Sequence, residues 1–186
     1  DVERSRGLGD VYKRQERRNN WMIKIRREQI AGMNMHYKYR TLDYFFKTQQ
    51  ALGIKNIEFW CARPHFLLDD YGFEDAAELK KNAADYGLTI GAFSPECTIY
   101  NYALCCHDET ARKHSIGYFE NGIRAAAEAG AKVMVLNCCG GARNEDPRRI
   151  FERAVQTLRR LSKTAAEEGV IPVSYTHLTL PTKRIV

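Results

Sequence analysis

Side chains that follow the apolar runs of the chain have the residue types of a small-molecule site, and His36, Asn101 and Asn137 are among them. Trp60, Arg63 and His65 end one apolar run of the sequence, and Glu96 follows the end of a later one. Carboxylate, imidazole and guanidinium groups can hydrogen-bond hydroxyls, and an indole ring can stack on the C–H face of a sugar. These residues therefore predict a substrate-binding site for a sugar or another polyol.

A repeated junction indicates the framework that positions these residues. Four helical patterns end at a glycine, and an apolar run follows each of them. The glycines are Gly53, Gly87, Gly130 and Gly169, at intervals of 34 to 43 residues. Glycine at a helix end accepts the positive φ that other residues avoid. Strands and helices that alternate at this period predict right-handed βα units around a parallel sheet.

Apolar periodicity predicts four helices between five strands. The strands are expected at 29–35, 56–60, 88–93, 132–137 and from 170 onward, and the helices at 41–52, 73–86, 108–129 and 147–168. This α/β order fits a doubly wound sheet or a (β/α)8 TIM barrel. A dinucleotide-binding sheet is disfavoured because no GxGxxG follows the first strand. Since a barrel typically needs about 250 residues, the chain predicts a partial barrel of about four βα units.

Each candidate residue also has a structural interpretation. His65 could brace the loop after Pro64, and Glu96 could be a solvated turn residue. Arg63 lies in the turn at Pro64, because proline cannot continue the strand. Glu58 lies within the second predicted strand, where it could point into the barrel or pair with a basic residue at the strand edge. The sequence leaves these alternatives open.

Composition argues against several classes of function. The net charge is +6, but the stretches 1–21 and 173–186 supply four of these charges, so the body lacks the basic surface of a nucleic-acid-binding protein. Six cysteines include two adjacent pairs and no CxxC, which argues against a zinc ribbon or a thioredoxin-type site. The sequence shows no signal peptide and no long apolar run, so we expect no membrane association and a cytoplasmic location.

Both ends of the chain differ in character from its body. Residues 1–15 have no amphipathic period. Both this stretch and residues 173–186 resemble end sequences found on translated metagenome reading frames. We expect residues 1–21 to be a non-native leader before a natural start at Met22, residues 22–172 to be the N-terminal half of a barrel domain, and residues 173–186 to be a non-native tail. The alternative for the leader is a genuine basic arm.

The body of the chain resembles the sugar phosphate isomerase/epimerase family of xylose isomerase-like TIM barrels. Within that family it is most similar to fructoselysine 3-epimerases and other ketose 3-epimerases. The resemblance covers about residues 29–171 and is carried by the segments 53–60, 63–65, 90–96, 100–102 and 167–171.

The resemblance implies metal-assisted proton abstraction next to the carbonyl of a ketose or fructosamine-type sugar. Two glutamates would act as acid and base, and the metal would be divalent, usually Mn²⁺. The resemblance places the metal ligands at the end of the fifth strand and beyond, where this sequence departs from the family after Pro172. We therefore expect no catalytic residue, metal ligand or bound metal in this chain, which would be inactive alone. His65 and Glu96 would contact substrate, with Trp60 and Arg63 lining the pocket, and the full-length protein could form a homo-oligomer.

Two other interpretations remain open from the sequence. Hydroxypyruvate isomerase, inosose dehydratase and endonuclease chemistries occur on the same fold. A half-barrel could also act as a binding module without enzymatic activity.

Overall fold

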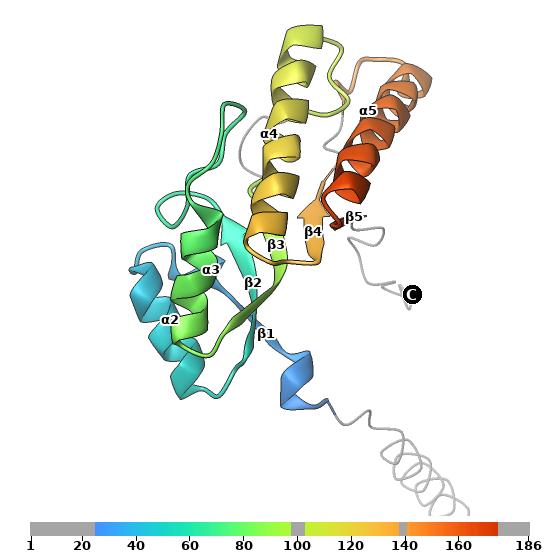
Figure 1. The fold of residues 1–186 in the computed structure, drawn as a ribbon. Helices are drawn as coiled ribbons and strands as arrows, with labels where there is room; N and C mark the ends of the chain where they lie inside the picture. The colour runs from blue at the N-terminus through green and yellow to red at the C-terminus, as the bar shows by residue number, and fades with distance from the viewer. Residues whose placement is uncertain (1–24, 98–102, 138–140, 175–186) are drawn as a thin grey trace, which may run out of the picture. The chain divides into compact units, whose positions relative to one another are not determined.

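The computed structural model describes residues 25–97, 103–137 and 141–174 (Figure 1). The predicted leader, Met22, the loop 100–102 and residues 138–140 lie outside these ranges. The chain divides into two units, residues 1–30 and residues 31–186. The described part of the first unit contains a short 3-10 helix, η1 (Arg27–Gln29). The second unit contains the sheet and all of the α-helices in the described ranges.

Five parallel strands form the sheet, and their spatial order is their order in the chain. They are β1 (Ala31–Met33), β2 (Asn56–Cys61), β3 (Thr89–Pro95), β4 (Val133–Leu136) and β5 (Ile171–Ser174). A doubly wound sheet would reverse direction at a switch point, whereas a barrel adds each strand beside the one before it. The observed order confirms the predicted α/β class and is that of a partial (β/α)8 barrel.

Each α-helix begins at a side chain that accepts a backbone N–H and ends before a left-handed glycine. The helices are α2 (Leu42–Ala51), α3 (Ala76–Asp85), α4 (Glu109–Glu128) and α5 (Pro147–Glu167), capped by Thr41, Asp75, Asp108 and Asp146. The four glycines of the predicted junctions all have positive φ, between 67° and 81°. The predicted glycine signal for the C-terminal ends of the helices is thus confirmed.

Several boundaries differ from the prediction. The first strand is shorter because a 3-10 helix, η2 (Asn34–Tyr37), follows it directly. The predicted helix at 73–86 begins only at Ala76, since Phe73 pairs with Leu68 in an antiparallel bridge. Val173 and Ser174 continue β5 opposite Val135 and Leu136. This pairing does not test whether residues 173–186 are a non-native tail, which stays a prediction.

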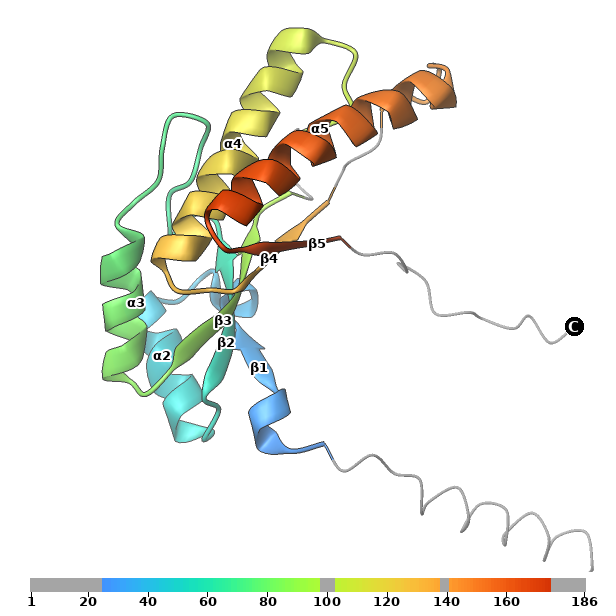
Figure 2. The same cartoon turned by 45° about the vertical axis from the view of Figure 1, so that its right-hand side comes forward.

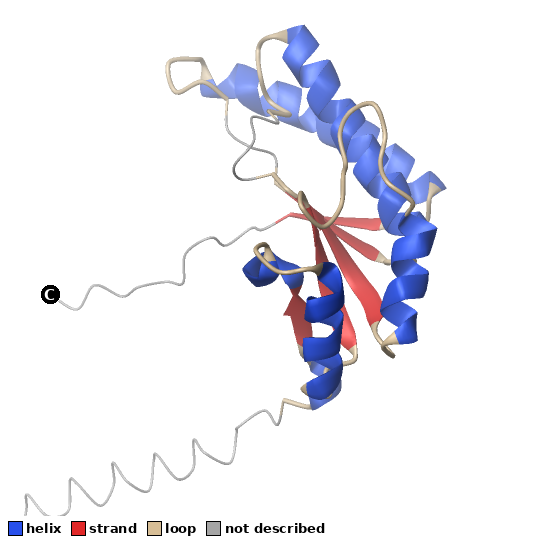
Figure 3. Ribbon diagram, turned by 90° about the vertical axis from the view of Figure 1, so that its left-hand side faces the viewer, coloured by secondary structure: helices blue, strands red, loops and turns tan. Residues whose placement is uncertain are grey.

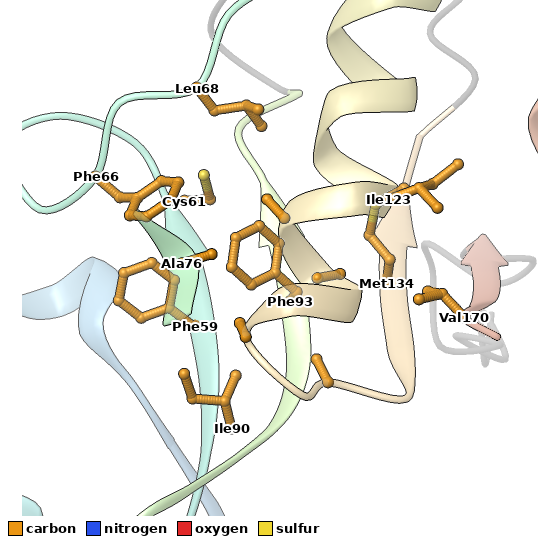
Figure 4. Packing of buried hydrophobic residues seen from close by; sticks show 14 of the residues in the cluster. Phe59, Cys61, Phe66, Leu68, Ala76, Ile90, Phe93, Ile123, Met134 and Val170 are labelled. Carbon is orange, nitrogen blue, oxygen red and sulfur yellow. The ribbon is translucent and has the colours of Figure 1, made fainter. Parts of the chain in front are cut away.

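One face of the sheet packs against the helices and forms the core (Figures 3 and 4). Phe59 of β2 and Phe93 of β3 are fully buried there, with ring centroids 5.7 Å apart. Phe45, Phe46 and Phe119 also belong to the core, because each is at most 2% exposed. Aromatic side chains of this size supply much of the apolar area that stabilises the unit.

Helices α4 and α5 lie side by side in both Figure 1 and Figure 2. Arg160 of α5 donates two hydrogen bonds to the Glu120 carboxylate of α4, at 2.7 and 3.1 Å. Helix α4 also approaches β3 closely, since a Cβ at Gly122 would lie 3.0 Å from Pro95 Cγ. Phe151 shares a helical face of α5 with the buried Leu161 and Ala165 but is 69% exposed, so the packed part of this face begins later in the helix.

The described α-helices lie on one side of the sheet, away from its opposite, inner face (Figure 3). On this face Ile171 and Val173 of β5 are 61% and 41% exposed. Strand β5 pairs with β4 from Val133 to Leu136, so β4 is an inner strand of the sheet. Among the described strands, the two edges are β1 and β5.

Candidate functional site

A buried hydrogen bond joins two of the predicted site residues at the carboxyl ends of adjacent strands. Trp60 at the end of β2 donates its indole Nε1–H to Glu96 Oε2 at 2.8 Å, and the two residues are 7% and 4% exposed. The Glu96 backbone is also fixed, because its N–H donates to Cys61 and its carbonyl accepts from the Tyr118 hydroxyl. The structure therefore brings Trp60 and Glu96 together in a defined geometry.

A second carboxylate lies one layer below this pair. Ser94 donates its hydroxyl to Glu58 Oε1 at 2.6 Å, and Ser94 is the register partner of Trp60. Side chains alternate between the faces of a strand, and Phe59 points into the helix-side core, so Glu58 and Trp60 share the inner face. Of the two interpretations of Glu58, this geometry supports the one in which it points into the barrel.

His65 belongs to a different network. Its Nδ1 lies 2.9 Å from the Nδ2 amide nitrogen of Asn34, and its Nε2 lies 2.9 Å from the Arg40 carbonyl oxygen. An amide nitrogen and a carbonyl oxygen on the two sides require a neutral ring with its proton on Nε2. These contacts support the bracing role of His65, and they place it with Asn34 rather than with Glu96.

Arg63 lies farther out on the same loop. Its guanidinium is 3.6 Å from the Glu74 carboxylate, and its side chain is 62% exposed. Arg63 and Glu96 both line a cavity of about 230 Å³ between the end of β2 and α4, whose other walls include Phe66, Leu68 and Tyr118. Ligand pockets are generally larger, about 300–1,000 Å³, so this cavity fits only a small fragment of a substrate.

Asn34 and Tyr118 hold this site but are not among the residues predicted for it. Asn34 is completely buried directly after β1, and Tyr118 is buried on α4. Asn34 follows the carboxyl end of a strand, which is the position rule that singled out the other candidates. Tyr118 carries no comparable signal, because an aromatic residue on a helix is usually a core residue.

The described ranges contain no group of three or more His, Cys, Asp or Glu residues that could hold a metal ion. Glu58 and Glu96 each receive a hydrogen bond from a protein side chain. The donor set present here therefore does not fit a metal centre. In the same ranges, no helix is long and apolar enough to cross a lipid bilayer.

We expect Cys61 to resist alkylation in the folded chain. It is 1% exposed, and burial raises the pKa of its thiol well above the ordinary value, with a further contribution from Glu74. Because the thiolate is the reactive form, iodoacetamide at pH 8 should label Cys61 about 100-fold more slowly than the half-buried Cys106. Mass spectrometry of the labelled peptides measures both rates, and equal rates in the native chain would contradict the prediction.

Comparisons with known proteins agree with this architecture. Fructoselysine 3-epimerases of Shigella flexneri and Escherichia coli O157:H7 are 26% and 25% identical over 129 residues, which cover 69% of this chain and 47% of each relative. The chain therefore spans about half the length of these curated relatives.

Solved structures also superpose on the chain. They include L-ribulose 3-epimerase, with a TM-score of 0.60 at 19% identity over 77% of this chain and 48% of that one. The 3-keto-D-glucoside 4-epimerase of E. coli gives a TM-score of 0.60 at 16% identity, over 77% and 54% of the two chains. At these identities the likeness shows the fold alone, a TIM barrel of which this chain forms part.

A family profile gives the assignment. The profile described as "Xylose isomerase-like TIM barrel" matches residues 46–179, which is most of the chain. The protein is therefore a member of the xylose isomerase-like TIM barrel family.

Proposed function

We propose that this chain is part of a sugar epimerase or isomerase that abstracts a proton next to the carbonyl of a ketose or fructosamine-type sugar. The observation that carries the proposal is the buried Trp60–Glu96 pair at the strand ends, where barrels of this kind bind their substrates. The likeness to fructoselysine 3-epimerases supports the choice of substrate class.

In this proposal the described residues bind the sugar and orient it. The indole N–H occupies one of the acceptor positions of the Glu96 carboxylate and fixes its direction. A carboxylate fixed in this way is suited to accept a hydrogen bond from a sugar hydroxyl, and burial strengthens such a bond. We also propose the identity of the sugar class and the formation of a homo-oligomer by the full-length protein.

A divalent metal, Mn²⁺ in the family resemblance, would supply Lewis-acid stabilisation of the negative charge that forms next to the carbonyl. The donor set in the described ranges does not fit such an ion, so we propose that its ligands lie elsewhere in the protein and assign no step to it here. On the same reasoning, we expect the 186-residue chain to be inactive alone.

The test compares the 186-residue chain with the product of the genomic reading frame continued past codon 172. Each is incubated in D₂O with fructoselysine, D-fructose or D-psicose, with Mn²⁺ or with EDTA, and deuterium uptake at C3 is followed by NMR. We expect uptake only for the longer product with Mn²⁺. Uptake by the short chain would overturn its predicted inactivity. Failure of the longer product on every ketose, with turnover of hydroxypyruvate, inosose or abasic DNA instead, would overturn the epimerase proposal.

Glu96→Gln in the longer product should lower kcat/KM about 10- to 100-fold, mostly through KM. The reason is that a hydrogen bond to a charged acceptor contributes about 1.5–3 kcal/mol, and a neutral amide replaces that acceptor. Steady-state kinetics measure the effect. The matched control is Glu152→Gln on the exposed surface of α5, which should leave kcat/KM unchanged. Equal values for the two variants would remove Glu96 from the site.

A further inference from the structure

The side chain of Asn34 extends the pairing of β1 and β2 beyond the point where the backbone pairing stops. The backbone register of the two strands ends at Met33 and Glu58. Beyond it, Trp60 N–H donates to Asn34 Oδ1 at 2.6 Å, and Asn34 Nδ2 donates to the Trp60 carbonyl at 2.9 Å. The amide group thus satisfies both backbone groups of Trp60, as a neighbouring strand would.

The orientation of this amide is fixed by a third contact. Asn34 Nδ2 also lies 2.9 Å from His65 Nδ1, and His65 Nε2 in turn lies 2.9 Å from the Arg40 carbonyl oxygen. Exchanging the amide oxygen and nitrogen would place like groups against both backbone atoms of Trp60. Asn34 is completely buried, so water cannot replace these partners without a rearrangement.

On its other side, Trp60 is tied to β3. It lies opposite Ser94 in the strand register, and its indole donates to Glu96. The backbone of Trp60 is therefore held between Asn34 and β3, and its ring extends from that fixed point to the carboxylate. Any movement of the backbone would move the donor Nε1 away from its acceptor.

We propose that Asn34 is a positioning residue that directs the Trp60 indole toward Glu96. The effect of Asn34 on turnover rests on the proposed function, whereas the positioning of the Trp60 indole can be measured without any activity. Asparagine is the side chain that meets this need, because it offers one acceptor and two donors at one position. Asp has nearly the same shape but would place a second acceptor against the Trp60 carbonyl.

The test uses the 186-residue chain labelled uniformly with ¹⁵N. Its two indole signals belong to Trp21 and Trp60, and Trp21→Phe assigns them. We expect Asn34→Asp and Asn34→Ala to speed hydrogen exchange of the Trp60 indole about tenfold relative to the Phe93 backbone N–H, which corresponds to about 1.4 kcal/mol of local opening. Asn82→Ala, on the exposed surface of α3, is the control and should change neither rate.

Each outcome of this experiment bears on the proposal. Equal acceleration at the Trp60 indole and at Phe93 would mean that Asn34 only stabilises the whole unit, and an unchanged indole rate would mean that it does not position the ring. Either result overturns the inference. In the longer product, Asn34→Asp should raise KM as Glu96→Gln does. If the wild-type product epimerises no ketose, the proposed function fails while the exchange result stands by itself.

Discussion

Phe93→Ala should lower the free energy of unfolding by about 3–5 kcal/mol, the usual cost of removing a fully buried aromatic ring. Phe93 is 0% exposed, and its ring centroid lies 5.7 Å from that of Phe59 and 6.0 Å from that of Phe66. These rings come from β2, β3 and the loop after β2 (Figure 4). Their packing holds the layer that carries Trp60 and Glu96, so the variant should also weaken the site.

Urea denaturation followed by circular dichroism measures this loss. Phe151→Ala removes the same side chain from an exposed position on α5 and should change the stability by less than about 0.5 kcal/mol. A loss at Phe93 no larger than the loss at Phe151 would mean that the helix-side core does not stabilise the unit.

Trp60→Phe should cost about 2 kcal/mol of stability, because it removes the indole N–H while leaving an aromatic ring in place. The buried Glu96 carboxylate would then lose the hydrogen bond at 2.8 Å, and losing a hydrogen bond to a buried charged group costs about 1.5–3 kcal/mol. In the longer product, Trp60→Phe alone should raise KM, as Glu96→Gln alone should.

A double-mutant cycle separates the hydrogen bond from the packing of the ring. Trp60→Phe and Glu96→Gln are measured singly and together, and contacting residues of this kind should show a coupling of about 1 kcal/mol. Additive losses would indicate that the two side chains act independently. The loss for Trp60→Phe would then come from the changed shape of the ring alone.

Much of the fold could be predicted from the sequence because its signals are local. Glycine at positive φ, the capping residues Thr41 and Asp108, and apolar periodicity act within a few residues of each boundary. That Trp60 and Glu96 lie at the same edge of the sheet follows from the same information, because parallel strands bring their carboxyl ends to one edge, whereas the hydrogen bond between them does not.

Other features depend on contacts between distant segments. The sequence does not reveal that Asn34 pairs with a residue 26 positions later or that His65 uses both of its ring nitrogens. The late start of α3 has a similar cause, since Phe73 pairs with Leu68 instead of entering the helix. Exposure of Phe151 could not be predicted from its helical periodicity, which specifies a shared face but not how far the neighbouring elements extend.

The agreement between strand order and chain order has a consequence for synthesis. Since each of the strands β2 to β5 pairs with the strand made just before it, its partner in this part of the sheet has already been synthesised when it emerges from the ribosome. Each new βα unit can dock on a surface that already exists, so structure can accumulate from the N-terminal side at the pace of translation.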